Sequence, residues 1–212
     1  MALLRKASRR LPSILPWRTP TERGIGLVVG LGNPGARYDG TRHNIGYEAV
    51  TAVLAERPFA PRHFDGGILV DAEFSGRRVS LLRPTGYMNR SGDAVRRFLA
   101  GGRLRPADTL VVCDDYALPL GAIRTRRRGS DGGHNGLASV FGALGTTDVP
   151  RMRLGIGAPP AGEDPADYVL APFGKRETDD VADLLERAAL AIEAAIGNGL
   201  DAAMNRYNRT PA

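Results

Sequence analysis

The sequence has 212 residues, of which 42% are hydrophobic and 25% charged, so it is long enough for one well-buried core and short for two domains. No run approaches the roughly 20 consecutive apolar residues that cross a bilayer, which argues against a membrane protein. The single cysteine, Cys113, cannot form an internal disulfide. These observations predict a protein of the reducing cytoplasm.

The formal net charge of +6 favours a polyanionic partner, although a high arginine content can also reflect genomic composition. Residues 1–21 are basic without any acidic residue and contain three prolines. This segment resembles a transit peptide in composition but lacks a long apolar core. We expect residues 1–23 to be a disordered basic extension, residues 24–208 to form the folded domain, and residues 209–212 to be a tail.

The first half of the domain predicts a strand, a loop, a helix and a hairpin. Leu27–Val29 is a short apolar run between glycines, typical of a buried strand. A polar loop covers residues 33–44, and apolar residues at helical spacing then predict a helix over Ile45–Leu54. Ile68–Val70 and Val79–Leu82 are β-type runs on either side of a Ser-Gly turn, which predicts a hairpin.

The second half of the domain continues the alternation of predicted strands and helices. We predict strands at Thr109–Cys113, Ala122–Arg126 and Met152–Ile156, and helices at Ser91–Leu99, Asn135–Leu144 and Thr178–Ile196, followed by a short last helix. Ser91 is the predicted cap of its helix. The strand that ends at Arg126 is more polar than the others and should lie near an edge. The pattern predicts a single-domain α/β fold, with a mixed, twisted β-sheet and helices packed on both faces.

One glycine-rich run raises the possibility of a dinucleotide cofactor. Gly30–Gly35 matches the G-x-G-x-x-G pattern and follows a strand. In that pattern a helix begins at the last glycine and holds the pyrophosphate, but here Pro34 and Gly40 postpone the helix. The acidic residue expected about 20 positions later falls within the helix, near Glu48 or Glu56. We therefore predict no cofactor.

Polar residues that suit hydrolysis follow the predicted strands. They are Asn33, His43, Asn89, Asp114, His134 and Asn135. Strand ends and the loops beyond them form the sites of open α/β sheets, so these side chains should converge. His43 could take a proton from water, with Asp114 fixing its tautomer. Asparagine amides could bind a carbonyl or an oxyanion, although Asn and Asp also cap helices and shape turns.

Metal and thiol chemistry fit the sequence less well. The three histidines include no i, i+4 pair, no cysteine cluster exists, and asparagine is a poor zinc ligand, so we predict no metal site. Cys113 lies in an apolar strand that should raise the pKa of its thiol, which argues against a nucleophile. The sequence also lacks a G-x-S-x-G motif.

Several short motifs occur in the order found in one family. They are Gly30–Gly35, Thr41–Asn44, Tyr87–Gly92, Asp114–Asp115, Gly132–Gly136 and Arg153–Gly157. Over residues 26–208 the chain resembles the bacterial peptidyl-tRNA hydrolases, and several ordered motifs are far more specific than any one of them. Cys113 and Ala117 depart from the polar residues common at these positions in relatives.

The resemblance implies a monomeric, metal-free enzyme that hydrolyses the ester of peptidyl-tRNA and recycles the tRNA. By similarity, His43 is the base, Asp114 supports it, and Asn33 helps to distinguish peptidyl from free aminoacyl esters. The implied contacts to the 3′ end and peptide are Tyr38, Tyr87, Asn89, His134 and Asn135. The implied phosphate contacts are Arg124, Arg126, Arg127 and Arg128, for which a solvated strand edge stays the alternative. A chloroplast branch of the family binds RNA for intron splicing, so an RNA-binding protein without catalysis is the second hypothesis.

Overall fold

The computed structural model describes residues 24–208 except 56 and 58. The expected extension over residues 1–23 and the tail over residues 209–212 lie outside the described residues. Within the described part, no helix is both long and apolar enough to span a membrane.

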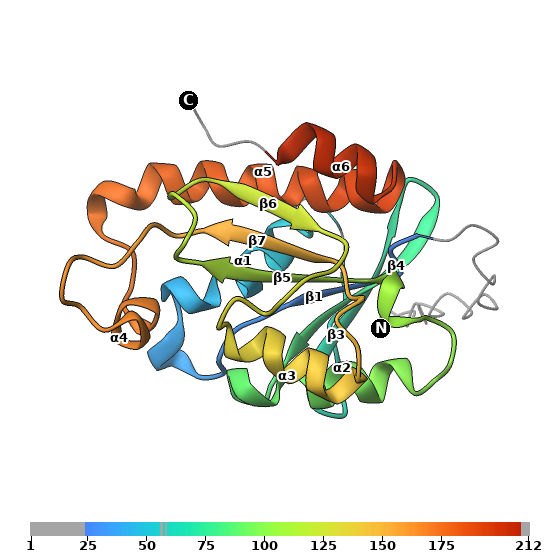
Figure 1. Cartoon of the computed structure of the whole chain (residues 1–212). Helices are drawn as coiled ribbons and strands as arrows, with labels where there is room; N and C mark the ends of the chain where they lie inside the picture. The colour runs from blue at the N-terminus through green and yellow to red at the C-terminus, as the bar shows by residue number, and fades with distance from the viewer. Residues whose placement is uncertain (1–23, 56, 58, 209–212) are drawn as a thin grey trace, which may run out of the picture.

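The centre of the domain is a seven-stranded mixed sheet in the order β2-β3-β4-β1-β5-β7-β6 (Figure 1). The strands are β1 (Leu27–Gly30), β2 (Arg62–Phe64), β3 (Gly67–Phe74), β4 (Arg77–Pro84), β5 (Thr109–Asp115), β6 (Ile123–Arg126) and β7 (Arg151–Gly155). β4, β1, β5 and β7 are parallel, whereas β2, β3 and β6 are paired antiparallel at the two sides. The predicted mixed sheet, its hairpin and the edge position of β6 are confirmed.

Helices cover both faces of the sheet, as predicted (Figure 1). The helices are α1 (Ile45–Ala52), α2 (Ser91–Leu99), α3 (Asn135–Leu144), α4 (Pro165–Leu170), α5 (Thr178–Gly197) and α6 (Leu200–Tyr207). Residues of α1, α5 and α6 pack on one face around Val28, and residues of α2 and α3 pack on the other around Leu27 and Val29. Alternate side chains of a strand point to opposite faces, so a strand covered on both faces is apolar throughout.

Three local predictions differ from the structure. Ser91 does not cap α2: it is the first helical residue, and its hydroxyl donates to the Met88 carbonyl of the preceding 3₁₀ turn at 2.9 Å. The short edge strand β2 was not predicted because its sequence, Arg-His-Phe, has no apolar alternation. Helix α4 was not predicted, although Asp164 caps it and Pro165 occupies its first turn, a combination typical of a helix start.

The loop after β1 determines where the site can form. It contains two 3₁₀ turns, Ala36–Tyr38 and Arg42–Asn44, and α1 begins only at Ile45. The Gly30–Gly35 run is therefore followed by a three-residue 3₁₀ turn and not by the start of an α-helix, unlike the dinucleotide pattern. The chain instead passes through the Arg42–Asn44 turn, whose residues are buried beside the end of β5.

Candidate active site

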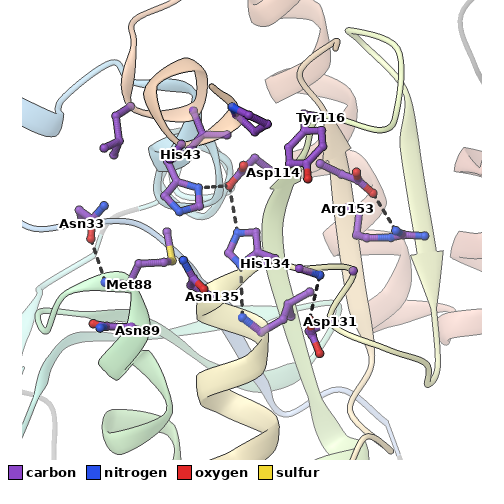
Figure 2. A pocket seen from close by; sticks show the side chains of 18 of the residues that line it. Asn33, His43, Met88, Asn89, Asp114, Tyr116, Asp131, His134, Asn135 and Arg153 are labelled. Carbon is purple, nitrogen blue, oxygen red and sulfur yellow. Dashed lines mark hydrogen bonds and ion pairs between the residues drawn. The ribbon is translucent and has the colours of Figure 1, made fainter. Parts of the chain in front are cut away.

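A cleft of about 380 Å³ opens where β1, β5 and β7 end. Its walls come from the loop after β1, the 3₁₀ turn Met88–Arg90, the start of α3 and the short helix α4 (Figure 2). Seven predicted site residues line it: Asn33, His43, Tyr87, Asn89, Asp114, His134 and Asn135. The expectation that these residues converge at the strand ends is met.

Asp114, the penultimate residue of β5, lies at the centre of the polar network. Its Oδ1 is 2.8 Å from His43 Nδ1 and 3.0 Å from His134 Nε2 (Figure 2). Burial alone would raise the pKa of this carboxyl, but the charge and hydrogen bonds of His134, together with those of His43, hold the pKa well below its usual range. Asp114 is therefore an anion at any pH at which an imidazole titrates.

His134 is fixed in one tautomer by the backbone. It is the N-cap of α3, and its Nδ1 accepts from the amides of Gly136 at 3.1 Å and Leu137 at 3.2 Å. A nitrogen that accepts two hydrogen bonds carries no proton, so the proton of neutral His134 lies on Nε2 and is donated to Asp114. Helix capping, the alternative raised for the asparagines and aspartates, is here a role of His134, which also contacts Asp114.

His43 is the residue best suited to act as a base. It lies in the buried 3₁₀ turn Arg42–Asn44 and lines the cleft. Because Asp114 is ionised, His43 Nδ1 donates to it, which leaves Nε2 unprotonated in the neutral ring. An imidazole held in this tautomer by a carboxylate can take a proton from water and is stabilised once it has done so.

Asn33 is held by hydrogen bonds through both its backbone and its side chain. Its backbone amide donates to Asn44 Oδ1 at 2.8 Å, and Asn44 Nδ2 returns a bond to the Asn33 carbonyl at 3.0 Å. Asn33 Oδ1 accepts from the Met88 amide at 2.8 Å (Figure 2). With its oxygen engaged, Asn33 can offer the two protons of Nδ2 to a substrate.

Other predicted contacts differ in position. Tyr87, Asn89 and Asn135 are exposed and line the cleft, so they are accessible to a ligand. Tyr38 does not line it: the tyrosine lies in the first 3₁₀ turn, with Arg37 Nη2 2.5 Å from its hydroxyl.

The cleft also contains residues that the sequence did not single out as site residues. Tyr116 and Asp131 come from loops, Arg153 comes from β7, and α4 contributes Val169 and Leu170 among others. Arg153 Nη1 pairs with Asp115 Oδ2 at 2.7 Å. An arginine in an otherwise apolar strand and an Asp-Pro helix start were the available indications; nothing in the sequence distinguished the loop residues.

The two imidazoles and Asp114 also form the one cluster among the described residues with the spacing of a metal site, because their ligand atoms lie within 4.8 Å of one another. Coordination through His134 Nε2 would move the ring proton to Nδ1, where two backbone amides already donate. The capping bonds of α3 therefore disfavour a metal here, and the donors fit a hydrogen-bonded network better.

The basic residues on β6 and directly after it lie outside the cleft. Arg124, Arg126 and Arg128 are exposed, and Arg127 Nη2 pairs with Asp201 Oδ2 of α6 at 2.6 Å. Asn208 binds the edge of this strand with both ends of its amide, accepting from the Thr125 amide at 2.6 Å and donating to the Thr125 carbonyl at 3.0 Å. In the pairing of β6 with β7, Arg124 lies opposite Arg153, and Arg153 lines the cleft.

Comparison with known proteins agrees with this geometry. The family model described as peptidyl-tRNA hydrolase matches residues 27–212. The chain belongs to the peptidyl-tRNA hydrolase family. A peptidyl-tRNA hydrolase of Nocardia farcinica is 46% identical over 193 residues, which cover 90% of this chain and 100% of the relative. One from Chloroflexus aggregans is 47% identical, with 86% of this chain and 98% of the relative covered.

Solved structures give the same result. The crystal structure of peptidyl-tRNA hydrolase from Acinetobacter baumannii superimposes with a TM-score of 0.82 at 31% identity, covering 88% of this chain and 95% of that one. The predicted family and fold class are confirmed.

The two departures from the common peptidyl-tRNA hydrolase pattern leave the network around Asp114 intact. Cys113 is fully buried in β5, and burial raises the pKa of its thiol well above the ordinary value. The backbone amide of Ala117 donates to Asp115 Oδ1 at 2.9 Å. Residue 117 thus contributes to the turn after β5 through its backbone amide, which does not depend on its side chain.

Proposed function

We propose that this chain hydrolyses the ester bond of peptidyl-tRNA with a water molecule activated by His43. The observation that carries the proposal is the pair formed by His43 Nδ1 and the buried Asp114 carboxylate at 2.8 Å, in a cleft lined by asparagine amides. Membership of the peptidyl-tRNA hydrolase family supports the same reaction.

The reaction follows from the assigned tautomers. Water loses a proton to His43 Nε2 as its oxygen adds to the ester carbonyl carbon, and Asp114 stabilises the imidazolium that forms. The tetrahedral intermediate then collapses, the bond to the tRNA 3′ oxygen breaks, and that oxygen takes the proton back from His43. The products are a peptide acid and free tRNA.

Amide donors suit the charge that develops on the carbonyl oxygen. Asn33 Nδ2 is positioned by the bond from Met88 to its Oδ1, and Asn89 and Asn135 are exposed in the cleft. Preorganised neutral donors stabilise an oxyanion without adding net charge. We assign Asn33 the further role of favouring peptidyl over free aminoacyl esters, as the family resemblance implies.

The remaining predicted residues are assigned to binding. Tyr87, Asn89 and Asn135 are accessible in the cleft and suit the 3′ end and the peptide. Both ring nitrogens of His134 are engaged, so its role is to support Asp114. Tyr38 lies outside the cleft and is assigned to a more distant part of the substrate.

The phosphates of the tRNA are assigned to Arg124, Arg126, Arg127 and Arg128. We further propose, as the family resemblance implies, that the protein acts as a monomer in the cytoplasm on an RNA substrate, without DNA or membrane partners. Light scattering of the purified protein would test the oligomeric state, and a stable dimer would contradict it.

The test of the reaction is release of labelled N-acetyl-aminoacyl groups from tRNA, with unblocked aminoacyl-tRNA in parallel. We expect cleavage of the blocked substrate, and a rate lower by roughly 10² to 10⁴ in His43→Ala with nearly unchanged tRNA affinity, the usual scale for a lost general base. Normal turnover by His43→Ala would refute the mechanism. Salt-sensitive RNA binding by a wild-type protein without cleavage would instead support the noncatalytic hypothesis.

A further inference from the structure

Helix α4 forms one wall of the cleft and is too short to hold its own position. Its six residues, Pro165–Leu170, supply Pro165, Ala166, Val169 and Leu170 to the lining. An isolated helix of this length is unstable in water, so its place depends on tertiary contacts. The Tyr168 hydroxyl donates to the Ile156 carbonyl at 2.8 Å, and Tyr168 and Val169 pack in the core. Most of the polar contacts of α4 and the segment after it involve one residue, Arg42.

Arg42 precedes His43 in the same buried 3₁₀ turn and contacts α4 and the segment after it in several ways. Its Nη2 pairs with Glu177 Oε2 at 2.8 Å, its Nη1 donates to the Pro172 carbonyl, and its backbone amide donates to the Ala171 carbonyl at 3.1 Å. The guanidinium also lies over two aromatic rings, Tyr168 at 4.4 Å and Phe173 at 4.9 Å.

The chemistry of arginine and the burial of the Arg42 side chain both suit these contacts. A guanidinium is planar, offers five donors in a fixed fork and stacks on aromatic rings, whereas a lysine ammonium is a single point charge. The Arg42 side chain is 9% exposed, compared with 27% for its partner Glu177. The side chain therefore joins the turn that carries His43 to the helix that faces it across the cleft.

We infer that Arg42 is a positioning residue, which fixes the α4 wall relative to His43 and thereby determines how well the peptide part of the substrate binds. This inference rests on the proposed function. The apolar side chains of Val169 and Leu170 suit a peptide better than they suit phosphate or ribose. The basic residues assigned to tRNA phosphates lie on β6 or directly after it and take no part in the Arg42 contacts.

Arg57 provides a matched control. It pairs with Glu193 at 2.7 Å, lies 4.5 Å over the ring of Phe74 and donates to the Glu73 carbonyl at 3.3 Å. Arg57 thus combines an ion pair, an aromatic ring and a backbone carbonyl, as Arg42 does, but none of its partners lines the cleft. Loss of Arg57 should affect stability without changing the α4 wall.

The experiment compares Arg42→Met, Arg42→Lys and Arg57→Met by amide hydrogen exchange, steady-state kinetics with N-acetyl-Phe-tRNA, and binding of deacylated tRNA. In Arg42→Met we expect amides of residues 165–173 to exchange about tenfold or more faster. We expect KM to rise roughly 5- to 50-fold with kcat changed less than about threefold, the pattern of lost binding rather than lost chemistry. Deacylated tRNA should bind as before, and Arg42→Lys should be intermediate. Arg57→Met should match the wild type in KM, in tRNA binding, and in the exchange of residues 165–173 relative to the rest of the domain.

Wild-type exchange and KM in Arg42→Met would overturn the inference, and so would an equal rise of KM in Arg57→Met, which would indicate a general loss of stability. If Arg42→Met does not fold, Glu177→Gln tests the same anchor, with a smaller change in the same direction expected and no change contradicting it. Failure of the proposed function is separate: the wild type would not cleave the substrate, while hydrogen exchange would still report whether Arg42 holds α4.

Discussion

The Asp114 carboxylate receives hydrogen bonds from two imidazoles on one oxygen, and this determines what each ring can do. His134 is held by backbone amides on its other side, whereas His43 has one ring nitrogen left for the cleft. Two histidines with the same carboxylate thus have different roles because the surrounding backbone differs. One ring supports the carboxylate and the other is available for proton transfer.

Replacing Asp114 with asparagine should separate the charge of this residue from its size. We expect Asp114→Asn to lower kcat/KM roughly 10²- to 10⁴-fold, because the imidazolium of His43 loses its anionic partner. The comparison is made with wild-type protein on N-acetyl-aminoacyl-tRNA. A loss below about tenfold would show that the carboxylate is not needed for His43 to act.

The same variant has a defined pH dependence of stability. The pKa of Asp114 is lowered by its bonds to His134 and His43, so its contribution is present above the unfolded value of about 3.9 and is lost as pH falls through the lower folded value. In urea titrations from about pH 5 to pH 2.5, the difference in unfolding free energy between wild type and Asp114→Asn should shrink as the pH falls below about 4. A difference that grows on acidification would contradict the assigned ionisation.

Among the secondary-structure elements, the central strands were predictable, whereas for helix α4 the sequence offered only the Asp-Pro start and not the helix that follows it. The runs at Leu27–Val29 and Thr109–Cys113 are apolar throughout because helices cover both faces of the sheet. Six residues at Pro165–Leu170 carry too little periodicity, and their helix depends on Arg42, more than a hundred residues earlier in the chain. A local pattern cannot record a contact of that sequence separation.

The candidate site also has a part that the sequence predicted and a part that it did not. Its polar residues were predictable because strand ends are where they converge, and His43 and Asp114 do meet there. The tautomer of His43 depends on the Asp114 carboxylate, and the free end of the Asn33 amide depends on the Met88 backbone amide; folding alone brings these groups close. Tyr116 and Asp131 lie in loops without a distinguishing pattern, so their place in the cleft could not be predicted.

Two glycines test how closely α2 and α3 must pack to support the cleft. The Gly92 amide donates to Ser139 Oγ at 3.0 Å, and a Cβ on Gly92 would clash with the Ser139 carbonyl. We expect Gly92→Ala to destabilise the fold by about 1–3 kcal/mol, the usual scale for overpacking. Gly142 on α3 has open space around it, so Gly142→Ala should stabilise by about 0.5–1 kcal/mol through helix propensity. Equal midpoints of urea unfolding for the two variants would contradict the close packing of α2 and α3.

Over the whole molecule, the strand that carries Arg124 and Arg126 is paired with β7, which contributes Arg153 to the cleft. β6 is an edge strand, and Asn208 after α6 occupies the backbone groups of Thr125 that would otherwise be unpaired. Arg124 lies opposite Arg153, which lines the cleft. A substrate with a reactive end in the cleft and phosphates along β6 matches this arrangement.

The salt dependence of tRNA binding should distinguish among the arginines on β6 and directly after it. Arg126 and Arg128 are exposed and, within the described part of the chain, form no ion pair, whereas Arg127 is paired with Asp201. Each arginine that neutralises a phosphate releases counterions, so removing one should reduce the slope of log K against log salt by about 0.7 to 0.9. We expect this change for Arg126→Gln and for Arg128→Gln, and a smaller one for Arg127→Gln, because Arg127 must first leave Asp201. Deacylated tRNA titrated at several salt concentrations gives the slopes directly. Wild-type slopes in both Arg126→Gln and Arg128→Gln would mean that the strand edge is merely solvated and that the phosphates bind elsewhere.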